Sequence, residues 1–293
     1  MPSRPSSAEG FATGKLILCG EHAVVYGHPA IAFAVERGTR VRLSPRPGPH
    51  ALPSNDPRLC RAMDALLGPE GFAVDIASDL PIGKGMGSSA ALAVATLRAV
   101  HRLRATPASP QALFDAAMVA ERVFHGNPSG LDVAAAIHGG LLGFTRQGGP
   151  QPLPSRPDWT VVVMDSGTQG NTAALVAGVA ERRSASGEVQ VALHRIGALV
   201  TEAEAALDDP AVLGPLLTEN HALLRSIGVS TPKLDELVTL ALNHGAWGAK
   251  LAGAGGGGVA IALTDDPSAL LSACDARAIP AFATQVQSPP ECA

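Results

Sequence analysis

The feature that most constrains this chain is a glycine-punctuated segment, residues 80–91, which runs directly into an alanine-rich helical pattern ending near Leu103. Glycine lets a backbone turn sharply and approach a ligand without a Cβ atom in the way. Ser88 or Ser89 can cap the predicted helix, whose unpaired N–H groups and positive dipole end attract anions. We therefore predict a phosphate-binding loop formed by Gly85, Met86, Gly87, Ser88, Ser89 and Ala90.

This loop differs from two common nucleotide-binding loops. A Walker loop needs Gly, four residues and then Gly-Lys-Ser/Thr, and the chain has no such order. Residues 83–88 also fail as a dinucleotide fingerprint, because Ser88 stands where the third glycine belongs. Taken alone, the segment fits an ordinary serine-capped loop equally well, and two other segments decide against that alternative.

The first of these is residues 14–27, near the N-terminus. Its apolar run 16–18 predicts a buried strand with Lys15 at its mouth. Glu21 and His22 follow in a glycine-bounded loop, where polar side chains can reach a ligand. The alternative is a solvated lysine and a surface Glu-His pair.

The second segment, residues 121–132, joins two predicted helices. One helix begins at the Ser109–Pro110 cap and ends at Gly126. Ser129 can cap the next helix and so places Asp132 near its start. An aspartate in a first turn is often only a dipole partner, which is the alternative here.

Together these segments resemble the GHMP kinase superfamily and, within it, the mevalonate kinases. The matching motifs are residues 14–27, 79–91, 125–132 and 250–258. They occur in family order between residues 11 and 263, so the resemblance covers most of the chain.

The motif at 250–258 contains Gly253, Gly255 and Gly258, which satisfy G-x-G-x-x-G. A dinucleotide site would need this pattern to open a helix inside a βαβ unit. Residues 259–263 instead predict a strand, with only a short tail after it. We therefore expect a glycine-rich connection between two strands and reject a dehydrogenase.

Phosphoryl transfer requires positioning, metal ligands for the phosphates, and a group that handles the acceptor's proton. Asp132 is the candidate base for an alcohol, and Lys15 would stabilise the incipient alkoxide. Mg²⁺ prefers oxygen ligands and keeps several bound waters, so two ligands from the protein are sufficient. Ser89 and Glu121 are the candidates for these two ligands. By resemblance, these four positions match the family's catalytic Asp, its active-site Lys and its magnesium-binding Ser and Glu.

The resemblance also implies residues around mevalonate and ATP. These are Glu21, His22, Thr172, Gly253, Ala254 and Gly255. Other polar residues receive no catalytic role: His125 is expected at a helix end close to the site, Lys250 can project to solvent, and Arg182–Arg183 can form a solvated helix face. Five histidines have no partner visible in the sequence, namely His28, His138, His194, His221 and His244.

Strands mixed with helices predict an α+β fold with two lobes. The expected strands lie near 13–19, 30–36, 38–44, 72–78, 159–165, 247–252 and 258–263. The expected helices lie near 56–67, 88–104, 111–125, 131–138, 188–206, 210–227 and 231–244. A breaker-rich stretch at 148–157 is the candidate boundary between lobes 1–150 and 151–293. The resemblance implies a ribosomal-protein-S5-like N-terminal lobe and a ferredoxin-like C-terminal lobe, with the active site between them.

The composition restricts the possible binding partners and the cellular location of the protein. A net charge of −4 provides no basic field for nucleic acid, and no apolar run is long enough to span a membrane. The first seven residues have no hydrophobic core of a signal peptide, and the four cysteines have no C-x-x-C spacing. We expect a cytoplasmic, reduced protein. The resemblance to the family implies a homodimer, although no motif in the sequence demonstrates one.

The resulting hypothesis is an ATP- and Mg²⁺-dependent kinase that phosphorylates the 5-hydroxyl of mevalonate in isoprenoid synthesis. The string at 132–137 is closer to phosphomevalonate kinases, which makes that activity the nearest alternative. Two further alternatives are a catalytically silent nucleotide-binding regulator and diphosphomevalonate decarboxylase. Retention of the four residues Lys15, Ser89, Glu121 and Asp132 argues against the regulator. The absence of extra basic residues in the motifs argues against the decarboxylase.

Overall fold

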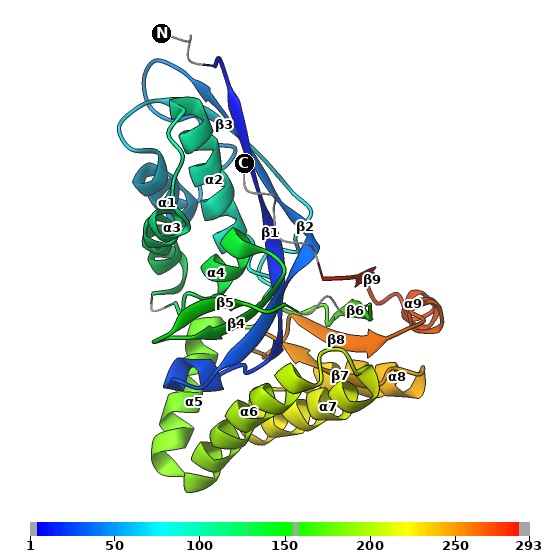
Figure 1. Ribbon diagram of the computed structural model, residues 1–293. Helices are drawn as coiled ribbons and strands as arrows, with labels where there is room; N and C mark the ends of the chain where they lie inside the picture. The colour runs from blue at the N-terminus through cyan, green and yellow to red at the C-terminus, as the bar shows by residue number, and fades with distance from the viewer. Residues whose placement is uncertain (1–4, 127, 155–157, 287–293) are drawn as a thin grey trace.

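The computed structural model describes residues 5–126, 128–154 and 158–286. Asn127 of the 125–132 motif, residues 155–157 of the candidate boundary, and Cys292 lie outside these described residues. The chain forms two antiparallel sheets, each covered by helices (Figure 1). The architecture is therefore α+β, as predicted.

The first sheet is organised around the long strand β2 (Ala30–Pro45). Its first half pairs with β4 (Leu141–Thr145) and its second half with β3 (Phe72–Ser78). Strand β1 (Ala8–Cys19) pairs along the opposite edge of β2, and β5 (Gly149–Pro152) extends the sheet beyond β4. The two strands predicted at 30–36 and 38–44 are thus one continuous strand. The breaker-rich stretch contains β5, so it is not a bare linker.

Four helices gather on one side of this sheet (Figure 1). They are α1 (Pro57–Leu67), α2 (Ser88–Arg104), α3 (Pro110–His125) and α4 (Leu131–His138). Helix α2 approaches β1 closely because small residues face each other: a Cβ atom on Gly10 would lie 2.0 Å from the Ala95 carbonyl oxygen. The alanine-rich sequence of α2 therefore allows the phosphate-loop helix to pack directly on the strand that carries Lys15.

The second sheet has the strand order β7-β8-β6-β9. Its strands are β6 (Thr160–Asp165), β7 (Gly248–Ala252), β8 (Val259–Thr264) and β9 (Ala281–Thr284). Helices α6 (Gly187–Ala205), α7 (Pro210–Ser226) and α8 (Pro232–Asn243) lie beneath it in Figure 1. Helix α9 (Ser268–Asp275) and β9 follow β8, so the expectation that only a short tail follows this strand is wrong.

Two further elements complete the described fold. The short 3-10 helix η1 (Ala23–Tyr26) leaves the end of β1, and helix α5 (Thr172–Ala185) follows β6. Between the sheets, the buried Trp159 indole packs edge-on against the Phe33 ring at 6.0 Å and donates Nε1–H to the Leu207 carbonyl at 2.8 Å. The apolar core is therefore continuous from one sheet to the other, and it fixes the two halves of the site against each other.

Candidate active site

The glycine loop adopts a shape that only glycine takes easily. Gly83, Gly85 and Gly87 have φ angles of +72°, +81° and +70°. Gly87 is the residue that caps α2, and neither Ser88 nor Ser89 makes a capping side-chain hydrogen bond. The predicted serine cap is therefore wrong, and both serines are the first helical residues. The N–H groups of this first turn have no intrahelical partner, which is the arrangement that binds phosphate.

Lys15 and Asp132 meet beside this loop. The Lys15 ammonium lies 3.2 Å from Asp132 Oδ1 and donates to the Gly85 carbonyl at 3.1 Å. The Lys15 side chain is 4% exposed and that of Asp132 is 32% exposed, so only the carboxylate opens toward a ligand. A Cβ atom on Gly87 would lie 3.2 Å from Lys15 Cγ and 3.7 Å from Asp132 Oδ2, which shows how closely the loop passes this ion pair.

Ser89, Glu121 and His125 form a second group at the start of α2 and the end of α3. Ser89 Oγ and His125 Nε2 are 3.0 Å apart, and His125 Nε2 lies 3.9 Å from Glu121 Oε2. His125 therefore sits at the helix end close to the site, as predicted, and its contact with Ser89 was missed by the sequence analysis. No sequence signal links a helix-end histidine to a serine on another helix.

Glu121 has a buried carboxyl group in which one oxygen lacks a hydrogen-bond donor within the part of the chain that the structure describes. Burial, followed by the nearby charge of Asp132, raises the pKa of Glu121 to about 7. Its Oε1 atom has no hydrogen-bond partner among the described residues. A buried anionic oxygen without a donor is poorly satisfied by the protein alone, and a divalent cation would satisfy it.

The Ser89 hydroxyl and the Glu121 carboxylate fit Mg²⁺ in their chemistry, because both offer hard oxygen ligands. Within the described residues no three His, Cys, Asp or Glu side chains cluster as a metal site. A cation held here would therefore take its remaining ligands from water and substrate phosphates, which is the usual coordination of Mg²⁺ in kinases.

The raised pKa of Glu121 gives a stability prediction. The folded protein favours protonated Glu121, so this contribution to stability is present below pH 4.5, the ordinary pKa, and is lost as pH rises through about 7. Glu121→Gln should therefore stabilise the protein at pH 8 by up to about 3 kcal/mol, while removing a candidate metal ligand. Urea unfolding at pH 8 and at lower pH tests this, with the exposed Glu188→Gln as control. A stability difference that does not shrink as the pH falls would contradict the prediction.

Glu21 is engaged inside the protein. Its carboxylate forms a fully buried ion pair with the Lys250 ammonium and accepts from Asn220 Nδ2 at 3.1 Å. Lys250 also lies 3.4 Å from the Ile17 carbonyl and is not exposed at all, so the expectation that it projects to solvent is wrong. The pair joins the end of β1 to β7. The direct contact of Glu21 with substrate stays a prediction.

His22 joins the same two regions. Its Nε2–H donates to the Ala254 carbonyl at 2.9 Å, and its backbone has a φ angle of +59°. Burial is the main cause that lowers the pKa of His22, so a neutral imidazole is favoured at neutral pH. His22 thus contacts one of the predicted substrate-binding residues of the glycine-rich motif.

The glycine-rich motif 253–258 connects β7 to β8, as predicted, and opens no helix. A Cβ atom on Gly253 would lie 3.4 Å from Gly85 Cα, and one on Gly258 would lie 2.9 Å from the Lys84 carbonyl. The two glycine loops of the chain therefore touch, and the site lies between the two sheets.

Thr172 is placed differently from the other predicted residues. It is the first residue of α5, directly after Asn171, whose Oδ1 caps the helix by accepting from the Ala174 N–H at 3.1 Å. Its side chain is exposed. Its role near the reacting groups stays a prediction.

Lys84 forms an ion pair that the sequence analysis missed. Its ammonium lies 2.7 Å from Asp165 Oδ1 at the end of β6 and 3.1 Å from the Thr168 carbonyl. Gln169 Nε2 donates to the Ile82 carbonyl at 2.9 Å, which adds a second link. The phosphate loop is thus held from both sides, by α2 and by the segment after β6.

Loss of the Lys84–Asp165 ion pair should raise KM for ATP and change kcat little. Lys84→Met breaks a partly buried pair worth about 1 kcal/mol and leaves the loop less ordered. We expect KM for ATP to rise roughly three- to tenfold, with kcat changed by less than about twofold. Steady-state kinetics with varied ATP measure both, and Lys233→Met on α8 is the surface control. An unchanged KM would contradict the prediction.

The buried Lys15 and the partly exposed Asp132 thus form an ion pair beside the glycine loop and the start of α2. This is the arrangement expected of a small-molecule kinase site. The profile of the GHMP kinase N-terminal domain matches residues 58–140, and that of the GHMP kinase C-terminal domain matches residues 201–278. The chain belongs to the GHMP kinase family and is an ATP-dependent small-molecule kinase.

Several proteins similar to this chain are mevalonate kinases. The chain is 37% identical to mevalonate kinase of Pyrococcus horikoshii, over 86% of this chain and 87% of that protein. It is 34% identical to mevalonate kinase of Aeropyrum pernix, over 88% of each. The crystal structure of L. major mevalonate kinase in complex with R-mevalonate superposes with a TM-score of 0.86 at 30% identity, covering 97% of this chain and 98% of that one. This similarity confirms the predicted fold.

Among the described residues, none of the helices combines the length and the apolar character that crossing a membrane requires.

Proposed function

We propose that this chain is a mevalonate kinase, which transfers the γ-phosphoryl group of ATP to the 5-hydroxyl of mevalonate. The observation that carries the proposal is the Lys15–Asp132 ion pair at 3.2 Å beside the phosphate loop, in a chain 37% identical to a mevalonate kinase. The proposed substrates are therefore ATP and mevalonate.

Asp132 accepts the proton of the acceptor hydroxyl as that oxygen bonds to the γ-phosphorus. The bond from the γ-phosphorus to the β,γ-bridging oxygen breaks, and ADP leaves with its electron pair. Lys15, held in place by the Gly85 carbonyl, supplies positive charge next to the developing alkoxide. The first-turn N–H groups of α2 bind the phosphates.

Ser89 and Glu121 would hold Mg²⁺, which when bound neutralises the charge on the phosphates. His125 shares the Ser89 hydroxyl and so fixes that side chain before the nucleotide arrives. The neutral His22 imidazole, anchored on Ala254, and Glu21 beside it would line the acceptor side of the site. Asp132, unlike Glu21, has a partly exposed carboxylate and can therefore reach an acceptor.

Acceptor-dependent ADP release with Mg²⁺-ATP tests the proposal, comparing mevalonate, 5-phosphomevalonate, homoserine and galactose. We expect release with mevalonate alone. Release with 5-phosphomevalonate alone would favour the phosphomevalonate alternative and overturn the proposal. Binding of ATP without release for any acceptor would favour the non-catalytic regulator.

Three finer points of the proposal rest on family resemblance and composition. They are the Mg²⁺ requirement, a homodimeric state and a cytoplasmic location. Metal replacement in the same assay tests the first, light scattering tests the second, and cell fractionation tests the third.

A further inference from the structure

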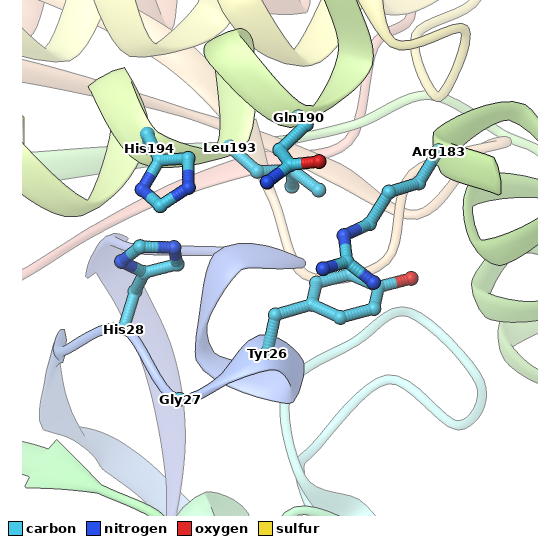
Figure 2. Close-up of a pocket in the computed structure, with 7 residues that line it drawn as sticks. All are labelled: Tyr26, Gly27, His28, Arg183, Gln190, Leu193 and His194. Atoms are coloured by element: carbon cyan, nitrogen blue, oxygen red, sulfur yellow. The ribbon is translucent and has the colours of Figure 1, made fainter. Parts of the chain in front are cut away.

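A small pocket lies between η1, α5 and α6, apart from the Lys15–Asp132 pair. Its volume is about 160 Å³, and its lining residues are Tyr26, Gly27, His28, Arg183, Gln190, Leu193 and His194. Figure 2 shows Arg183 over the Tyr26 ring on one side and the two histidine rings facing each other on the other side. None of the seven lining residues is acidic, and none belongs to the phosphoryl-transfer site.

Arg183 provides a permanent positive charge. Its guanidinium carbon lies 4.6 Å from the Tyr26 ring centroid, so the plane of the cation is held by the aromatic ring. Stacking of this kind leaves the in-plane N–H donors free for an anion. Within the described residues, Arg183 makes no salt bridge with a carboxylate. A stacked arginine without an acidic partner is a typical feature of anion sites.

His28 and His194 form the other side of the pocket. Their ring centroids are 4.8 Å apart in an edge-to-face arrangement. The His28 ring rests on α6 only because residue 197 is glycine: a Cβ atom there would lie 2.6 Å from His28 Nδ1. Glycine lowers the stability of a helix interior, yet Gly197 is the residue that leaves room for the His28 ring.

The electrostatics of the pocket favour an anion. The pKa of His28 is lowered by burial and then by the charges of His194 on α6 and Arg183 on α5, the charged and titratable groups that face it. A negative charge in the pocket would offset this repulsion, because it favours the protonated form of His28.

We propose that this pocket binds the phosphate group of a small phosphomonoester. The cavity exceeds the roughly 30 Å³ share of one water severalfold, and it is smaller than the roughly 300–1,000 Å³ of pockets that enclose drug-sized ligands, which argues against a whole nucleotide. Arg183, the histidines and the Gln190 amide supply donors to the phosphate oxygens. Leu193 and the Tyr26 ring supply an apolar wall for the first carbons of the ester. This site is independent of the proposed function.

The test uses NMR of the histidine Cε1–H signals of the full chain, with a non-hydrolysable ATP analogue filling the phosphate loop. The probes are n-butyl phosphate and inorganic phosphate, at pH 6 and pH 8, against sodium chloride at equal ionic strength. His28→Gln and His194→Gln assign the two signals, and Arg183→Gln removes the permanent charge. Arg37→Gln is the matched control, because Arg37 also stacks on an aromatic ring, 3.6 Å from the centroid of Phe282.

We expect saturable shifts of the His28 and His194 signals at both pH values, with butyl phosphate binding more tightly than inorganic phosphate. Arg183→Gln should weaken binding about tenfold or more, and Arg37→Gln should leave it unchanged. Shifts no larger than those with chloride, or equal shifts in Arg183→Gln, would overturn the site. Equal affinity for the two phosphates would overturn the assignment to a phosphomonoester.

Discussion

Replacement of Asp132 by asparagine is expected to lower kcat by about 10²- to 10⁴-fold. Asparagine keeps the size of the side chain but cannot accept the proton of the acceptor hydroxyl, so the transition state loses roughly 3–5 kcal/mol of stabilisation. The Lys15 ammonium also loses its ion-pair partner at 3.2 Å, although it keeps the Gly85 carbonyl. ADP release at saturating mevalonate and ATP measures the effect.

Two controls separate chemistry from folding in this variant. Binding of a fluorescent ATP analogue should change by less than about threefold, because the phosphate loop is untouched. Asp75→Asn, at an exposed position of β3, should retain normal turnover. If Asp132→Asn keeps kcat within about tenfold of the parent, Asp132 is not the base.

Replacement of Lys250 by methionine should destabilise the protein by about 3–5 kcal/mol. The substitution leaves the Glu21 carboxylate buried and without its counter-charge, and a single buried charge costs more than the pair contributes. Asn220 remains as a single donor to that carboxylate. Urea unfolding monitored by circular dichroism measures the change in free energy of unfolding.

The double variant Glu21→Gln/Lys250→Met gives the decisive comparison. Removal of both charges should recover most of the lost stability, because no uncompensated ion remains. Lys233→Met, which breaks an exposed pair with Glu236 on α8, should change stability by less than about 0.5 kcal/mol. If Lys250→Met is as mild as this control, the buried pair does not hold the two regions together.

Helices and strands with strong local signals were predicted closely. The expected ranges 88–104, 131–138 and 72–78 coincide with α2, α4 and β3. Glycines flank both ends of α4 and the starts of α2 and β3, and their backbone preferences act within a few residues. The C-cap of helix α2 is instead Ala105, which adopts the left-handed conformation with a φ angle of +48°. Arg182 and Arg183 lie on an exposed helix face as expected, but the range of this helix, α5, was not predicted. Val179 is its one buried residue, so its sequence has no apolar stripe to reveal its extent.

The short strands were missed for a different reason. Strand β9 has four residues and exists because it pairs with β6. Strand β5 pairs with β4 through residues that individually favour turns, including Gly149 and Pro150. Pairing across a sheet overrides such local preferences, and the sequence of one strand does not show its partner.

The position of Lys250 also could not be predicted from the sequence of its own strand. Every residue of β7 is buried, so the strand has no solvent face to which its lysine could point. A strand covered on both faces lacks the alternation of polar and apolar residues that would reveal its orientation. Solvent exposure was therefore the natural expectation for a lysine, and the structure reverses it.

The sequence by itself determined the kinase family and the glycine loop, and it selected Lys15, Ser89, Glu121 and Asp132 as candidate site residues, because motifs depend on residue types at short spacings. Only the tertiary structure decided which charge meets which: Lys15 with Asp132, Lys84 with Asp165, and Lys250 with Glu21, 229 residues away. Backbone torsion preferences are local and can be read from neighbouring residues. Burial and Coulomb pairing depend on which elements the fold brings together, so they appear only once the two sheets have packed.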